Sequence, residues 1–176
     1  MGREQFIAIP GVFMGALRGV ATEWNGVKIF APTTNTAGQP RLSSAFQSSF
    51  ARYLAPYLEV LKRNGVAPRN RELKLLDEPH FDLRNQTVLE QAVVLYRFVK
   101  ATCAPFGGCC IRSSGFYIPA EIAALLGPED IWDANSDSLS AHAKAYAAAV
   151  AESGVRLTIC EFSYSYCMHA GRHSHP

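Results

Sequence analysis

The dipeptide Asn25-Gly26 is the sequence feature that most constrains the fold of this chain. Both residues tolerate a positive φ angle, which the two central positions of a type I′ turn require. The flanking segments, 21–24 and 27–30, carry the aromatic and β-branched residues that are typical of strands. The sequence therefore predicts an antiparallel β-hairpin near the N-terminus.

Two long segments have the 3.6-residue apolar spacing of helices. The first spans residues 44–64, and Pro56 inside it predicts a kink or a split into two helices. The second spans residues 86–103 and starts either with Asn85 as its cap or with a capping box that begins at Thr87. Apolar residues on more than one side of this second helix predict that it is central and well buried.

Shorter elements complete the expected fold. The patterns predict strands over 5–9, within 72–76 and 111–118, and over 155–166, and helices over 119–126 and from Asp137 or Ser138 to Ser153. Strands open and close the chain, and helices lie between them, which favours α+β. We expect a single α+β domain over residues 1–169, with an N-terminal hairpin, three to four helices and a C-terminal strand in a mainly antiparallel or mixed sheet. Residues 170–176 form a short, polar, His-rich tail.

The charge content is low for a chain of this length. Apolar residues make up 48% of the 176 residues, which excludes a disordered chain, and charged residues make up only 18%. A protein partner or a homo-oligomer that covers an apolar surface explains the low charge, although uncharged polar residues can also supply the missing polarity. The net charge of +2 does not indicate a nucleic-acid protein globally. Residues 6–17 are too short to span a membrane. They resemble a signal peptide, but Glu4, Pro10 and Arg18 argue against one, so we expect a cytoplasmic protein without membrane contact.

Five cysteines allow several kinds of site. An odd number with an adjacent pair, Cys109-Cys110, does not resemble a secreted disulfide framework and predicts reduced thiols. Zinc is the one candidate cofactor, because it prefers four cysteine and histidine ligands. The candidate ligands are Cys109, Cys167, His169 and His173. Buried cysteines and an exposed tail are the simpler interpretation of the same residues.

A thiol enzyme is the second interpretation of the cysteines. Cys109 and Cys110 follow two glycines, which can expose a thiol in a turn. The base would be His80, His142 or His169, brought close by the fold.

Two acidic runs could bind a cation or transfer protons. They consist of Asp77, Glu78, His80 and Asp82, and of Glu129, Asp130, Asp133 and Asp137. Neither has the spacing of a calcium loop. We therefore expect a solvated loop for the first run and a solvated helix start for the second.

Two further segments are candidate binding surfaces. The basic segment 62–74 contains five cations that could contact phosphates or complement a helix C-terminus: Lys62, Arg63, Arg69, Arg71 and Lys74. The last strand alternates three aromatic residues that could face a partner or the core: Phe162, Tyr164 and Tyr166. These features favour a small binding or accessory protein that associates with a protein or nucleic-acid partner. The alternative is an enzyme with a Cys/His site, either with or without zinc.

Overall fold

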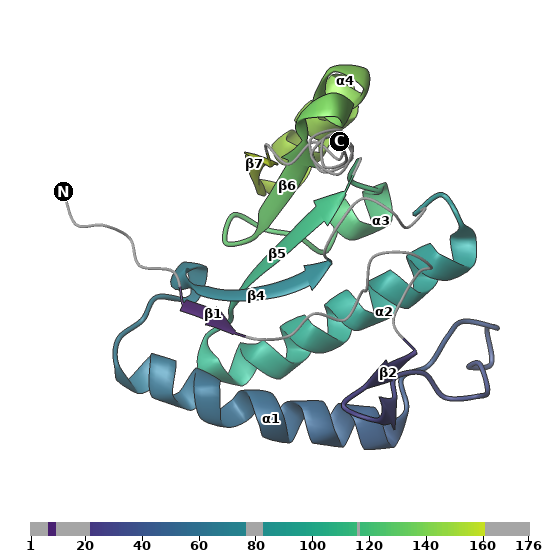
Figure 1. The fold of residues 1–176 in the computed structure, drawn as a ribbon, viewed down its shortest axis with the longest axis vertical. Coiled ribbons are helices and arrows are strands. Elements are labelled where there is room, and N and C mark those ends of the chain that lie inside the picture. Colours follow the sequence, from purple (N-terminus) through teal and green to yellow (C-terminus); the bar gives the residue numbers. More distant parts are fainter. Residues whose placement is uncertain (1–6, 10–21, 77–82, 116, 161–176) are drawn as a thin grey trace, which may run out of the picture.

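The computed structural model describes residues 7–9, 22–76, 83–115 and 117–160 (Figure 1). The strands are β1 (Ile7–Ile9), β2 (Glu23–Trp24), β3 (Val27–Lys28), β4 (Arg71–Leu76), β5 (Cys110–Gly115), β6 (Ile131–Asn135) and β7 (Arg156–Cys160). The α-helices are α1 (Ser44–Arg63), α2 (Gln86–Cys103), α3 (Ala120–Ala123) and α4 (Ser136–Ser153). Short 3₁₀ turns, η1 (Pro68–Asn70) and η2 (Ala104–Phe106), precede β4 and follow α2.

The main sheet has the strand order β1-β4-β5-β6-β7, and every neighbouring pair in it is parallel. The antiparallel pairing is in a separate two-stranded sheet of β2 and β3. The predicted α+β class with an N-terminal hairpin, four helices and a C-terminal strand is therefore confirmed at this level. The prediction of a mainly antiparallel or mixed sheet is wrong for the main sheet.

Helical connections explain the parallel pairing. Helices α2, α3 and α4 each connect two successive strands of the main sheet, and a crossover through a helix returns the chain to the same end of the sheet. In Figure 1 the helices border the strands, from α1 at the bottom to α4 at the top. Neighbouring helices also contact each other in this order, so they form one continuous layer.

The β2–β3 hairpin has the predicted turn. Asn25 and Gly26 have φ angles of 48° and 75°, as a type I′ turn requires. Trp24 packs its ring edge-on against Phe46 and Phe50 of α1, with ring centroids 6.1 and 5.4 Å apart. The hairpin therefore covers the first half of α1.

Both long helices lie where the sequence predicted them. Helix α1 continues through Pro56 as a single helix, so the predicted split did not occur. Helix α2 starts at Asn85, whose side chain accepts hydrogen bonds from the backbone N–H groups of Thr87 and Val88. Asn85, rather than Thr87, is therefore the cap.

The core lies between the main sheet and the helices. Leu73, Leu75, Ile111 and Trp132 are fully buried there, together with the apolar sides of α1 and α2. We call this side of the sheet the helix-facing side. The residues on it are Leu73, Leu75, Ile111, Ser113, Gly115, Trp132, Ala134 and Leu157.

A disulfide joins the end of α2 to the residue before β5. It links Cys103 to Cys109, whose Cα atoms are 5.8 Å apart. The prediction of reduced thiols is therefore wrong for these two cysteines, because η2 turns the chain back and places them side by side. In the described ranges, no helix has the length and apolar character needed to cross a membrane.

Candidate functional site

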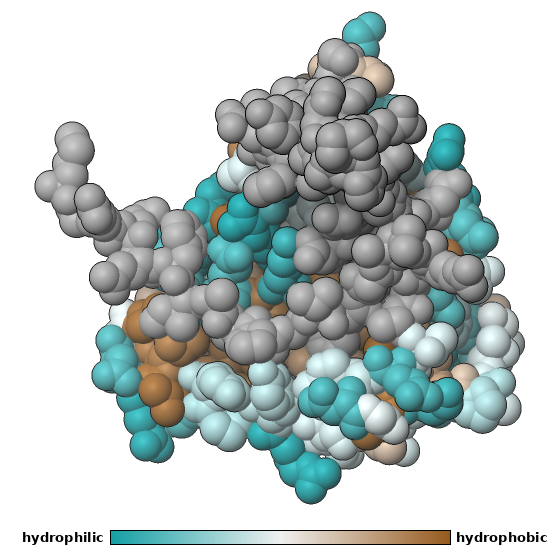
Figure 2. Space-filling model, viewed as in Figure 1, coloured by the Kyte–Doolittle hydropathy of each residue, from teal (hydrophilic) through white to brown (hydrophobic). Residues whose placement is uncertain are grey.

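The other side of the main sheet carries polar and charged residues, and we call it the polar face. In a strand, alternate side chains point to opposite sides, so these residues lie opposite the helices. The polar face consists of Glu72, Lys74, Cys110, Arg112, Ser114, Ile131, Asp133, Arg156 and Thr158. Cys110 and Ile131 are buried but do not belong to the core that contacts the helices. Figure 2 shows hydrophilic residues over β5 and β6.

An ion pair between Arg112 and Asp133 occupies the middle of the polar face. The Nε atom of Arg112 donates to Oδ2 of Asp133 at 2.6 Å, and its Nη2 atom donates to Oδ1 at 3.0 Å. The hydroxyl of Thr158 donates to the same Oδ1 atom. The Nη1 atom of Arg112 lies 3.4 Å from both carboxylate oxygens of Glu72. Strands β4, β5, β6 and β7 therefore each contribute one side chain to the network.

The geometry makes this pair strong. A guanidinium that donates two parallel bonds to one carboxylate combines charge attraction with a fixed orientation. The hydrogen bond to Asp133 raises the pKa of Arg112, although burial alone would lower it. The side chain of Asp133 is 7% exposed and that of Arg112 is 36% exposed, so a molecule on this face can still reach the guanidinium.

The part of the polar face near the amino ends of the strands is closed and unreactive. The Nη2 atom of Arg156 donates to the carbonyl of Glu129 at 2.9 Å and contacts Sγ of Cys110 at 3.7 Å. Burial raises the pKa of the Cys110 thiol to about 12, against the lowering effect of Arg156. A buried thiol with this pKa is not a nucleophile at neutral pH.

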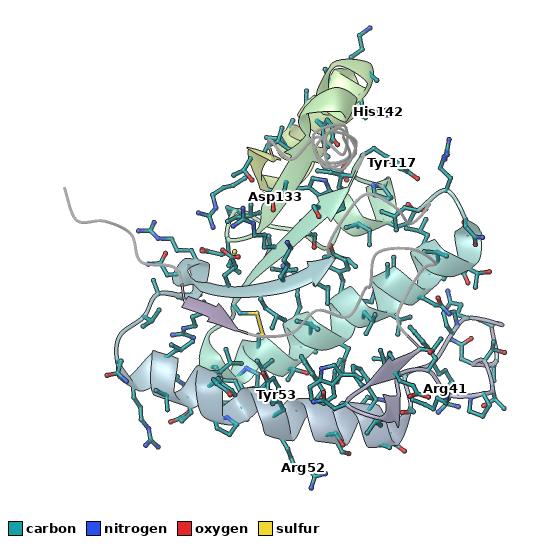
Figure 3. The ribbon with its side chains drawn as sticks, in the orientation of Figure 1. Arg41, Arg52, Tyr53, Tyr117, Asp133 and His142 are labelled. Atoms are coloured by element: carbon teal, nitrogen blue, oxygen red, sulfur yellow. A yellow bond between two sulfur atoms is a disulfide. The ribbon has the colours of Figure 1, made fainter. Side chains whose placement is uncertain are left out.

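The carboxyl ends of the strands carry an aromatic pair. Tyr117 follows β5, and His142 lies in α4, which follows β6. Their ring centroids are 6.0 Å apart, and the ring planes are inclined by 42°. The backbone of His142 leaves the helical range, with φ −120° and ψ 16°, so α4 is interrupted at this residue. Figure 3 labels Asp133, Tyr117 and His142 in the same upper part of the molecule.

The second acidic run has a structural explanation for two of its members. Asp130 is fully buried and accepts hydrogen bonds from Lys100 Nζ at 2.6 Å and from the backbone N–H of Ile111 at 2.8 Å. Asp133 is the buried partner of Arg112. The prediction of a solvated helix start is wrong for both residues, because they belong to β6 or to the turn before it. The sequence alone did not indicate Arg112 as a site residue. It indicated Asp133 only as one of the four carboxylates of the second acidic run.

The five cations of the basic segment lie on three different elements, α1, η1 and β4. Arg71 is 4% exposed, and its guanidinium donates to the carbonyls of Val66 at 2.8 Å and Phe106 at 2.6 Å, so it does not face a phosphate. Lys62 donates to the carbonyl of Pro105, and Arg63 pairs with Glu59. Of the remaining two cations, Arg69 is exposed in η1, and Lys74 lies on the polar face in β4.

Of the four predicted zinc ligands, Cys109 alone lies within the described residues. Cys109 forms the disulfide with Cys103, and in that state its sulfur is not a thiolate ligand. Its three predicted partners, Cys167, His169 and His173, lie outside the described residues, as does His80 of the thiol-enzyme interpretation. Within the described part of the chain, no group of three or more His, Cys, Asp or Glu residues is arranged to hold a metal ion.

Further predicted residues also lie outside the described ranges. They are the aromatic residues Phe162, Tyr164 and Tyr166, the acidic run from Asp77 to Asp82, and the tail 170–176. Their proposed roles stay predictions.

A groove on the helix side is the main alternative to the polar face. One part, of about 260 Å³, lies between α2, α3 and Gln39, and the next part, of about 420 Å³, lies between α2 and residues 40–42. Val94 and Arg97 line both parts. The groove brings together fewer hydrogen-bonded charged groups than the polar face does.

The polar face has the chemistry of a binding site for polar molecules. Asp133 and Glu72 offer carboxylate oxygens, and Thr158 offers a hydroxyl on the strand next to that of Asp133. No family model, no curated protein and no solved structure matches this chain, so its own residues are what point to a function.

Proposed function

We propose that the protein binds a small polar molecule on the polar face of its parallel sheet. The observation that carries this proposal is the Arg112–Asp133 pair, with Thr158 and Glu72, on the side of the sheet that faces away from the helices. The bound molecule would lie toward the carboxyl ends of the strands, because the amino end of this face is closed by Arg156 and Cys110.

Stability alone does not account for this network. Purely parallel sheets usually bury apolar residues on both sides. An ion pair that is withdrawn from water gains little net free energy, because desolvation offsets the attraction between the charges. A sheet selected only for stability would therefore carry aliphatic residues where β5 and β6 carry Arg112 and Asp133. Binding of a polar molecule gives these residues a reason to be there.

A ligand-detected NMR experiment tests the proposal. We would measure saturation transfer from the protein to a panel of hexoses, citrate, ATP and spermidine, for the wild type and for Asp133→Asn. We expect at least one compound to bind and its affinity to fall about tenfold or more in the variant. The control is Glu59→Gln, which breaks an exposed pair with Arg63 on α1. No binding of any compound, or equal affinity in Asp133→Asn, contradicts the proposal.

Association with a partner is a second proposal, in line with the prediction from the sequence. The outer strands of the main sheet, β1 and β7, each pair with a single described strand. Edge strands present backbone groups that can pair with another chain, including a second copy of this one. Light scattering between 5 and 200 µM (about the range of weak dimers) tests it. A mass of 19.3 kDa at every concentration would contradict self-association.

A further inference from the structure

We propose that the molecule bound at the polar face is a neutral, polyhydroxylated one, that is, a saccharide. This inference rests on the proposed function and names the chemical class of its ligand. Two observations support it: the balance of charges on the polar face and the acceptor capacity that its carboxylates retain.

The charges of the network largely compensate one another. Arg112 lies between two carboxylates, those of Asp133 and Glu72, and Lys74 lies beside Arg112 in the register of β4 and β5. An anionic ligand would meet two carboxylates beside the guanidinium of Arg112. A cationic ligand would have to displace Arg112 from bonds of 2.6 and 3.0 Å. A neutral ligand avoids both costs.

The carboxylates retain capacity for hydroxyl donors. A carboxylate offers about four lone-pair positions, and Asp133 uses three of them for Arg112 and Thr158. Glu72 makes only long contacts of 3.4 Å, and 12% of its side chain is exposed. Ligand hydroxyls can therefore donate to these two residues.

A set of matched compounds separates this inference from charged alternatives. Glucose, glucose 6-phosphate and glucosamine share one ring and differ in charge, and galactose, mannose, N-acetylglucosamine and cellobiose extend the neutral set. Binding is measured by saturation transfer and by titration calorimetry at pH 7. We expect one or more neutral sugars to bind, and the charged form of the same sugar to bind at least tenfold more weakly.

Three variants then locate the binding. Thr158→Val removes one hydroxyl and Glu72→Gln removes one carboxylate, and each should weaken sugar binding about tenfold. Arg97→Gln, in the groove beside α2, should leave it unchanged. Circular dichroism and thermal unfolding confirm that each variant is folded, and a third polar-face variant, Ser114→Ala, replaces any that is not.

Each result has a distinct meaning. If only charged compounds bind and the polar-face variants weaken them, the saccharide inference is overturned and the proposed function stands. If sugar binding is lost in Arg97→Gln and kept in the polar-face variants, the site is the groove and both proposals are overturned. If none of the neutral or charged compounds binds, both are likewise overturned.

Discussion

The two sides of the main sheet are built by the same strands from opposite kinds of residue. On the helix-facing side, Trp132 of β6 is fully buried among aliphatic and aromatic neighbours. On the polar face, the next residue of the same strand, Asp133, is almost as buried but is surrounded by a guanidinium and a hydroxyl. Within β6, burial is therefore similar on the two sides, and the chemistry of the contacts is what differs.

Because of this difference, we expect one side of the main sheet to contribute mainly to stability and the other side mainly to ligand binding. The helix-facing side gains free energy from the apolar area it removes from water. The polar face gains little from its ion pair and keeps donors and acceptors in a fixed arrangement. We expect substitutions on the first side to change mainly the free energy of unfolding, and substitutions on the second to change mainly ligand affinity.

The largest effect is expected for Trp132→Ala. The change removes a fully buried ring whose atoms would lie 2.9 Å from a Cβ atom placed on Gly115, which shows how tightly this part of the core is packed. Loss of the ring and the resulting cavity should lower the free energy of unfolding by about 3–5 kcal/mol. Urea denaturation followed by circular dichroism measures it. A loss smaller than about 1 kcal/mol would mean that the helix-facing side is not the main source of stability.

A smaller effect is expected for Asp133→Ala, which leaves Arg112 without its carboxylate. We expect a loss of about 2 kcal/mol, at the low end for broken ion pairs because Arg112 is partly exposed to water. The double variant Arg112→Met/Asp133→Leu should recover most of this stability, since it leaves no unpaired charge. It should not recover ligand binding. A double variant that is as unstable as the single one would show that the pair itself stabilises the fold.

The hydrogen bond between Tyr96 and Ser113 is a polar contact on the helix-facing side and sharpens the comparison. Both residues are fully buried, and the Tyr96 hydroxyl donates to the Ser113 hydroxyl. Ser113→Ala leaves the tyrosine hydroxyl without this partner and should cost about 1–2 kcal/mol. Tyr96→Phe/Ser113→Ala should cost less than Ser113→Ala alone, and ligand affinity should not change in either. A tenfold loss of affinity in Ser113→Ala would contradict the separation of the two sides.

The smallest effect is the pH dependence that Cys110 contributes. The pKa of its thiol is raised by burial to about 12 from an ordinary value of 9.0. The unfolded chain therefore loses this proton at a lower pH than the folded chain does. The stability that Cys110 contributes should be fully present below pH 9.0 and should fall as the pH rises toward 12.

Urea denaturation of the wild type and Cys110→Ala at pH 8, 9.5 and 10.5 (values that bracket the start of this loss) measures the contribution of Cys110. The stability of the wild type relative to the variant should decrease by about 1 kcal/mol or more over this range. Iodoacetamide should label Cys110 slowly in the native protein at pH 8. Labelling as fast as that of a small free thiol would show that this end of the polar face is open.

Local signals predicted a large part of the fold. Asn25-Gly26 specified its turn, because few dipeptides adopt two successive positive φ angles. The bounds of α2 followed from its apolar period and from the cap at Asn85. These features depend on residues that are close in the sequence, so one sequence is enough to reveal them.

The pairing of the strands and the candidate site were not predictable in this way. In the sequence, strand β6 is hard to distinguish from an acidic loop, because it has only 5 residues and directly follows the carboxylates Glu129 and Asp130. Whether β5 and β6 pair in parallel depends on the path of α3, which carries no signal for direction. The contact between Arg112 and Asp133 joins residues on different strands, and nothing local distinguishes these two from other charged residues. Such contacts appear only once the register of the sheet is known.

The order of the strands has a consequence for how the molecule is made. Strands β4, β5, β6 and β7 follow one another in the sheet as they do in the chain, so none of them is inserted between two earlier strands. As the ribosome extends the chain, each new helix and strand can dock on the edge left by the unit before it. The Arg112–Asp133 pair cannot form until β6 has emerged, and Thr158 joins it only with β7. The protein would therefore acquire its hydrophobic layer progressively during translation, and would complete its polar network among the last steps.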